Sequence, residues 1–112
     1  MNRIGTFKSV QWGTITISRS TYGDQHGPTA VMLFCEDGEP LATLSVNMYR
    51  PECSEDSRDL PAGCFYVKTW GGNEDLWPEA LASGMFAQRE DLPHAASGFV
   101  TAPAWQIVGG AR

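Results

Sequence analysis

The residues that could perform nucleophilic or metal chemistry are few and widely spaced. The cysteines and histidines stand at Cys35, Cys53, Cys64, His26 and His94, without a CxxC, HxH or HExxH pair. Because zinc sites use such closely spaced pairs, this pattern predicts buried thiols and loop histidines, with no bound metal or cofactor. An enzyme that pairs His26 or His94 with Cys53 is an alternative, but no GxSxG-like motif accompanies these residues. We therefore expect a protein that is not an enzyme and has no catalytic residues.

The cysteine count and context favour a reducing compartment. Three cysteines are an odd number, which argues against the disulfide framework of a secreted protein. Cys35 lies in an apolar run and Cys64 begins another, so both are expected to be buried. Cys53 has acidic residues on both sides, and their charge should raise the pKa of its thiol. This environment argues against an activated nucleophile.

Carboxylates are the most abundant chemical groups, and they concentrate in the middle of the chain. The chain has 13 acidic and 8 basic residues, a net charge of −5. Residues 36–91 alone hold twelve acids and four bases, a net of −8. This charge disfavours direct binding to nucleic acid or to an anionic membrane. Carboxylates clustered in loops are also solvated and ionised, unlike the two differently placed carboxylates of a glycosidase.

Four acidic segments follow one another along the chain, at 36–39, 52–59, 74–79 and 90–91, and the first three with a neighbouring tryptophan supply the candidate partner-binding residues. If two or three segments converge, they would resemble a phosphate backbone and could compete for a basic nucleic-acid channel on another protein. A solvated acidic face that serves solubility is the alternative interpretation. The other tryptophans are expected to fill the core. The candidates are Glu36, Asp37, Glu39, Glu52, Glu55, Asp56, Asp59, Trp70, Glu74, Asp75 and Glu79.

Alternating and apolar segments predict the first strands. Residues 14–18 alternate polar and β-branched types, while 29–35 and 40–48 are two further strand-like runs. Asp37-Gly38 between the latter two predicts a type I′ turn, which needs positive φ at both central residues. The strand at 40–48 should place a core face opposite a polar face that is solvated or contacts a partner. The core face would hold Ala42, Leu44, Val46 and Met48, and the polar face Thr43, Ser45 and Asn47.

The second half of the chain contains a long loop, further strands and a short helix. Residues 49–63 and 87–98 are expected to be loops, and 64–70 and 104–108 to be strands. A helix is expected over 78–83, with proline first, Gly84 just past its end, and Leu76, Ala80 and Leu81 toward the core.

These elements predict an α+β fold. We expect an antiparallel sheet of four to six strands with one or two short helices packed on one face. The length of 112 residues fits a single small acidic domain over 1–112. The first ten residues contain no apolar stretch typical of a signal peptide, and no run approaches the ~20 apolar residues of a membrane span.

Three blocks of the sequence resemble a small family of phage and plasmid proteins. The blocks read AVMLFCEDGEPLATLSVNMYRPE, CFYVKTWGGNEDLWPEALASGMF and SGFVTAPAWQIV, and together they cover about residues 30–108. The segment 36–47 is a moderately specific part of this resemblance. The family has no known catalytic residues to carry over. Among small acidic proteins of mobile elements, the chain looks most like the anti-CRISPR proteins, in particular a Pseudomonas inhibitor of the type I-C surveillance complex, Cascade.

The resemblance implies a protein-binding function in the cytoplasm of a bacterial host. It implies binding to a Cascade subunit with a basic DNA-binding surface, in particular the large subunit that reads the PAM, and hence loss of target-DNA binding. No direct contact with nucleic acid or a membrane is expected, and the protein is expected to be a monomer, with dimerisation through an exposed sheet edge left open. The alternative is another phage- or plasmid-encoded accessory domain without catalytic activity. Its partner contacts would lie on the face of Thr43, Ser45 and Asn47.

Overall fold

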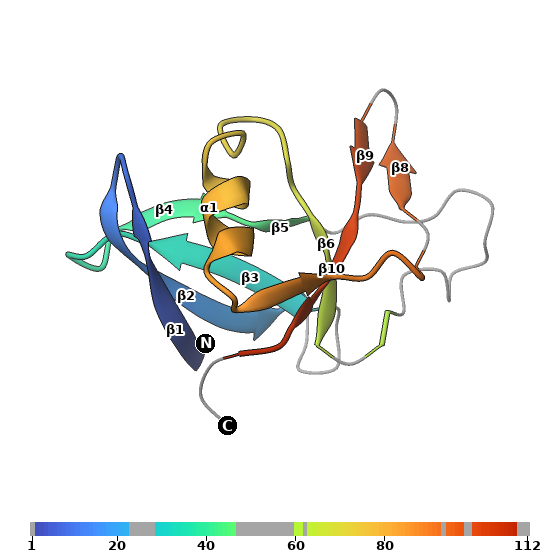
Figure 1. Cartoon of the computed structure of the whole chain (residues 1–112), viewed down its shortest axis with the longest axis horizontal. Helices are drawn as coiled ribbons and strands as arrows, with labels where there is room; N and C mark the ends of the chain where they lie inside the picture. The colour runs from blue at the N-terminus through green and yellow to red at the C-terminus, as the bar shows by residue number, and fades with distance from the viewer. Residues whose placement is uncertain are drawn as a thin grey trace.

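The chain folds into an α+β structure that is mostly antiparallel β-sheet with one short helix (Figure 1). The computed structural model describes residues 2–22, 29–46, 60–61, 63–92, 94–97 and 100–109. The elements within these residues are β1 (Asn2–Ser9), β2 (Gly13–Thr21), β3 (Thr29–Phe34), β4 (Pro40–Thr43), β5 (Ser45–Val46), β6 (Cys64–Val67), α1 (Leu76–Ala82), β7 (Phe86–Gln88), β8 (Ala95–Ser97), β9 (Val100–Ala102) and β10 (Ala104–Ile107).

The strands form two four-stranded sheets and a hairpin, where the sequence predicted one sheet of four to six strands. The first sheet has the order β1-β2-β3-β4, the second β5-β6-β10-β7, and β8 pairs with β9. All of these pairings are antiparallel. The helix α1 contacts β1 and β7, which are edge strands of the first and the second sheet. The two sheets and the helix thus enclose a shared interior.

The expected strand at 40–48 changes sheet at Leu44. Its N–H donates to the Val31 carbonyl in β3 (2.9 Å), and its own carbonyl accepts the Lys68 N–H just after β6 (2.7 Å). Ser45 was expected on a polar, accessible face, and this prediction is wrong because Ser45 is 2% exposed. Its hydroxyl oxygen accepts the buried Val31 N–H (2.8 Å), which requires the side chain to point inward. Asn47 and Met48 lie outside the described residues.

The β3–β4 hairpin is confirmed, but its turn is not type I′. Gly38 has φ +91°, whereas Asp37 does not have positive φ. The Gly38 N–H donates to the Cys35 carbonyl (2.9 Å), and the Cys35 N–H donates to the Glu39 carbonyl (2.8 Å). This is a turn with one left-handed glycine, and it is accompanied by a register shift between Leu33 and Phe34. A single glycine therefore supplies the positive φ that the expected turn would have divided between two residues.

The helix α1 begins two residues earlier than expected, so Pro78 is its third residue. The first turn tolerates proline there because its N–H groups have no partner within the helix. The carbonyl of Asn73 accepts the N–H groups of Leu76 and Trp77 (both 3.0 Å). Gly84, with φ +82°, follows the C-cap as predicted. The helix buries Leu76 and Ala80, and Leu81 packs partly buried against the core, as predicted.

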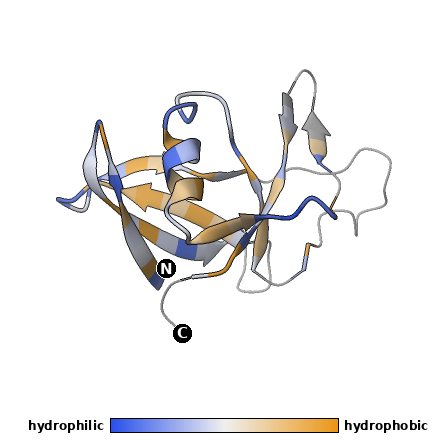
Figure 2. Ribbon diagram, in the orientation of Figure 1, coloured by the Kyte–Doolittle hydropathy of each residue, from blue (hydrophilic) through white to orange (hydrophobic). Residues whose placement is uncertain are grey.

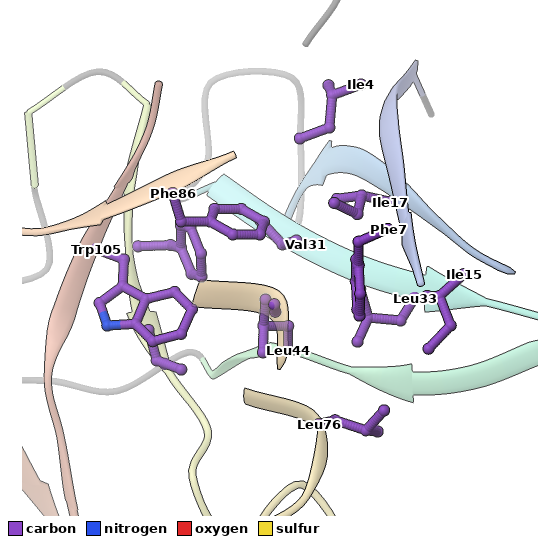
Figure 3. Packing of buried hydrophobic residues seen from close by; sticks show 13 residues of the cluster. Ile4, Phe7, Ile15, Ile17, Val31, Leu33, Leu44, Leu76, Phe86 and Trp105 are labelled. Atoms are coloured by element: carbon purple, nitrogen blue, oxygen red, sulfur yellow. The ribbon is translucent and has the colours of Figure 1, made fainter. Parts of the chain in front are cut away.

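The main core lies between the two sheets and α1. Figure 3 shows side chains from β1, β2, β3, β10 and α1 directed into one cluster. Trp105 is 1% exposed and lies against Phe65, Phe86 and Trp77, with ring centroids 5.7–6.3 Å apart. A second, smaller cluster surrounds Tyr66. The orange inner strands of Figure 2 show the same division between an apolar interior and hydrophilic turns.

Several short or irregular strands were not predicted. Residues 87–98 were expected to be loop, but they contribute to β7 and contain β8. β1 was missed as well, because its buried positions Ile4, Phe7 and Ser9 do not alternate regularly. A register shift between Arg3 and Gly5 interrupts the alternation that identifies a strand. Cys64 is buried as predicted, whereas Cys35 is only half-buried at the end of β3.

Candidate functional site

The β1–β2 turn presents two large apolar side chains to solvent. Val10 is 99% exposed and Trp12 is 43% exposed. The backbone of the turn is held from below by Glu79 of α1. The Glu79 carboxylate accepts the Ser9 hydroxyl (2.7 Å) and the Val10 N–H (2.8 Å). Because the backbone is fixed by these bonds, the exposed side chains are displayed from a defined position.

A groove of about 500 Å³ begins beside this turn. It runs between the turn, β4 and the segment that leads from β6 into α1. Asn73 lines the groove and joins two of its sides, because its side-chain amide donates to the carbonyls of Thr43 (2.8 Å) and Lys68 (3.0 Å). The lining residues are Gln11, Trp12, Leu41, Ala42, Thr43, Lys68, Gly71, Gly72, Asn73, Asp75 and Leu76.

Two consecutive glycines shape one wall of the groove. Gly71 and Gly72 have φ +65° and +99°, a left-handed conformation that favours glycine. A Cβ at Gly71 would also lie 3.2 Å from Cε of Lys68. The strand expected over 64–70 ends already at Val67, and the two glycines form a turn that lines the groove beside Lys68.

The groove contains one positive and one negative side chain that are not paired with each other. Among the described residues, Lys68 and Asp75 form no hydrogen bond or ion pair through their charged atoms. Asp75 precedes α1, but its carboxylate does not cap the helix. Both charges therefore remain available to a bound molecule.

Acidic residues from two of the predicted segments lie on either side of the β1–β2 turn. In the β3–β4 turn, Glu36, Asp37 and Glu39 are exposed. A Cβ placed on Gly13, next to Trp12, would be 3.7 Å from Oε2 of Glu36. On the other side lie three residues at the start of α1 and just before it: Glu74, Asp75 and Glu79. Figure 2 shows the β3–β4 turn and the segment before α1 as hydrophilic.

Some of these acids are committed to the fold and others are free. Glu79 holds the β1–β2 turn, and Glu74 accepts the Gly72 N–H (3.1 Å to Oε2). Asp37 accepts the Glu39 N–H within its own turn (3.0 Å). The other predicted acids, Glu52, Glu55, Asp56 and Asp59, lie outside the described residues.

The aromatic residue at this surface is not the one that the sequence indicated. Trp70 is half-buried and packs against the second apolar cluster, while Trp77 packs against the main core. Trp12 is the exposed tryptophan. Trp12 was expected to fill the core, and this prediction is wrong. The signal that could have indicated its exposure is the adjacent Gly13, a residue type common in turns. Val10 and Lys68 were not predicted as site residues. Only the folded chain brings residues 10–12 beside residues 68–76.

A separate polar cluster lies just after β7, beside β10 and the start of β6. The guanidinium of Arg89 donates to both carboxylate oxygens of Asp91 (2.8 and 2.7 Å). It also donates to the side-chain oxygen of Gln106 (3.1 Å) and approaches the sulfur of Cys64 (3.6 Å). The bonds from Arg89 lower the pKa of Asp91 to about 2. Burial raises the pKa of the Cys64 thiol, and the nearby Arg89 guanidinium opposes this shift.

The described residues provide no geometric support for a catalytic site or a metal site. His94 is exposed just before β8, and His26 and Cys53 lie outside the described residues. Within the described ranges, no three His, Cys, Asp or Glu side chains are grouped so that they could hold a metal ion. In the same ranges, no helix is both long and apolar enough to cross a membrane.

Comparison with family models, with curated proteins and with solved structures finds no match for this chain. The candidate site therefore rests on its own geometry: a fixed turn with exposed Val10 and Trp12, acids on both sides, and an adjoining groove with an unpaired Lys68 and Asp75.

Proposed function

We propose that this chain is a non-catalytic binding protein that attaches to a basic surface of another protein. The observation that carries this proposal is the exposed apolar turn of Val10 and Trp12 with acidic side chains on both sides. Interface centres are enriched in aromatic side chains, and tryptophan is common among the residues that dominate binding energy. The surrounding carboxylates would steer a basic partner and fix its orientation.

The partner that we propose is a DNA-binding subunit of type I-C Cascade, in particular the large subunit that reads the PAM. The sequence resemblance to anti-CRISPR proteins supports this choice, and so does the net charge of −8 over residues 36–91. A ligand of this charge competes with DNA for a positively charged channel. The protein would then act in the bacterial cytoplasm as a monomer, without touching nucleic acid.

Co-purification with type I-C Cascade, followed by target-DNA binding at low and high salt, tests the proposal. We expect a complex that no longer binds target DNA, and we expect inhibition to weaken as salt rises. Association without loss of DNA binding would contradict the inhibitor proposal while leaving an accessory binding protein. Absence of any association would contradict the choice of Cascade.

Charge-reversal variants locate the surface. Replacing Glu36, Asp37 and Asp75 by lysine should abolish inhibition, whereas Glu90→Lys reverses an exposed charge outside the groove and should not. For the apolar contact, Trp12→Ala should weaken binding, and Val108→Ala is the matched control because Val108 is 45% exposed. If the triple reversal inhibits as well as the unmodified protein, electrostatic competition through this surface is wrong.

The enzyme alternative is tested separately. Alanine at His26, His94 and Cys53 together should leave inhibition unchanged if the protein acts by binding alone. Loss of inhibition by a variant that remains folded would favour a catalytic role for these residues.

A further inference from the structure

We propose that the groove beside the β1–β2 turn is a binding site for an arginine side chain of the protein partner. This inference rests on the proposed binding function and specifies the contact that the partner makes. The groove has a volume of about 500 Å³ and combines an aromatic ring, an apolar wall and a free carboxylate. These are the groups that recognise a guanidinium at the end of an aliphatic chain.

The aromatic component is Trp12. Its side chain lines the groove and is 43% exposed, although the backbone beside it is held in place by Ser9, whose hydroxyl oxygen accepts the Trp12 N–H (3.2 Å). Tryptophan is the aromatic residue that attracts cations most strongly, and guanidinium stacks well on its face. Because the turn backbone is already held, the Trp12 ring can make the contact with little further ordering of the turn.

The carboxylate component is Asp75. At the position before a helix, an aspartate side chain commonly accepts a backbone N–H of the first turn. Here the Asn73 carbonyl accepts the N–H groups of Leu76 and Trp77 instead, so the Asp75 carboxylate makes no capping bond. Both of its oxygens are left to accept two parallel N–H groups, which is the geometry that arginine offers and lysine does not.

The apolar wall and the surrounding charge complete the argument. Leu41 and Ala42 of β4 line the groove and can cover the methylene groups of an arginine. Lys68 is the cation in the lining and opposes a second positive charge, while Asp75 in the same groove balances it. The Trp12 ring and the free Asp75 carboxylate both favour a cationic occupant over an anionic one.

A short blocked peptide tests the groove without Cascade. The probe is acetyl-Gly-Arg-Gly-amide, added at millimolar concentration to ¹⁵N-labelled protein while backbone and indole N–H resonances are followed. The Trp12 indole resonance is identified with Trp12→Phe. We expect shifts at Trp12, Gly71, Gly72 and Asp75, and smaller shifts for the peptide in which citrulline replaces arginine, because citrulline has the same shape without charge.

Variants separate this site from general attraction to an acidic protein. Trp12→Leu and Asp75→Asn should each weaken the arginine peptide about two- to fivefold, since exposed cation–π contacts and ion pairs contribute little individually. Glu90→Gln removes the same charge outside the groove and should have no effect. Lys68→Gln should strengthen binding, because it removes the opposing charge.

Three results would overturn the inference. Equal shifts with the citrulline peptide, or equal losses with Glu90→Gln and Asp75→Asn, would show that the groove does not select a guanidinium. Stronger binding of acetyl-Gly-Glu-Gly-amide, lost in Lys68→Gln, would show that the groove takes an anion. Binding of the arginine peptide by a protein that fails to associate with Cascade would support the groove and contradict the choice of partner, so the two failures remain distinguishable.

Discussion

The groove beside the β1–β2 turn and the cluster around Arg89 contain similar chemical groups and use them differently. In the cluster, one guanidinium satisfies Asp91 and Gln106 and approaches the Cys64 sulfur. In the groove, Lys68 and Asp75 lie along the same surface without a described partner. The polar groups of the cluster are bonded within the fold, whereas those two charged groups of the groove have no partner among the described residues.

The contrast extends to the neighbouring aromatic residues. Trp105 of β10 is adjacent in sequence to Gln106 and is 1% exposed within a group of rings. Trp12 in the β1–β2 turn is 43% exposed. Residue type alone therefore does not separate buried from exposed tryptophans. What separates these two is position: Trp105 lies in a strand inside a sheet, whereas Trp12 lies in a turn between two strands.

The largest expected effect on stability comes from removing a ring of the aromatic group around Trp105, next to the Arg89 cluster. Trp105→Ala should lower the free energy of unfolding by about 3–5 kcal/mol, because it leaves a large cavity among Phe65, Phe86 and Trp77. Trp12→Ala should cost less, about 1–2 kcal/mol, since 43% of the residue is already exposed to water. Urea unfolding of both variants measures the difference. Equal losses would contradict the distinction between the two tryptophans.

At Leu44 and Ser45 the chain passes from the first sheet to the second. Substitution there should have the next largest effect on stability. Ser45→Ala removes the hydroxyl that accepts the Val31 N–H and contacts the Tyr22 hydroxyl (both 2.8 Å). Leaving a buried N–H without an acceptor should cost about 1–3 kcal/mol of stability. Tyr22→Phe is the control, because it removes the second bond and keeps the first. A cost as large for Tyr22→Phe would place the effect on the tyrosine.

The regular parts of the fold could be predicted from the sequence, and the switch could not. The alternating residues of β2, the apolar run of β3 and the glycines around α1 each carry a local signal. Leu44 and Ser45 are neighbours and both are buried, which contradicts the alternation of a single strand. Only the arrangement of two sheets explains this, because the chain passes from one to the other at that point.

The candidate site was predictable in its charge and unpredictable in its geometry. The acids of the β3–β4 turn and of the α1 start are visible as clusters in the sequence. Their meeting around residues 10–12 depends on the contact between α1 and β1, which no local pattern encodes. Lys68 likewise becomes part of the site only because residues 68–76 fold back beside β4.

Substitutions at two acidic residues near the groove should differ in their effects on stability and on binding. Glu79→Ala removes two hydrogen bonds to the β1–β2 turn and should lower stability by about 1–2 kcal/mol. Asp75→Asn should change stability by less than about 0.5 kcal/mol, because its carboxylate makes no capping bond, while it weakens the arginine peptide. Thermal unfolding and peptide titration on the same samples measure both. A large loss of stability in Asp75→Asn would mean that this carboxylate also supports the fold.

The smallest expected effect is a pH-dependent one in the Arg89 cluster. Arg89 lowers the pKa of Asp91 from 3.8 to about 2, so the ionised carboxylate stabilises the folded state at pH values above 3.8. This contribution should be lost as the pH falls from about 4 to about 2, because the unfolded chain takes up the proton first. The difference in urea midpoint between the unmodified protein and Asp91→Asn should therefore be present at pH 7 and shrink toward zero near pH 2. Glu90→Gln, at the adjacent exposed residue, is the control for general charge effects.

A difference that persists unchanged at pH 2 would show that Asp91 acts through its shape or hydrogen bonding in the neutral form. In that case the Arg89 cluster would depend less on charge than the groove does, and the comparison between the two regions would have to rest on burial alone.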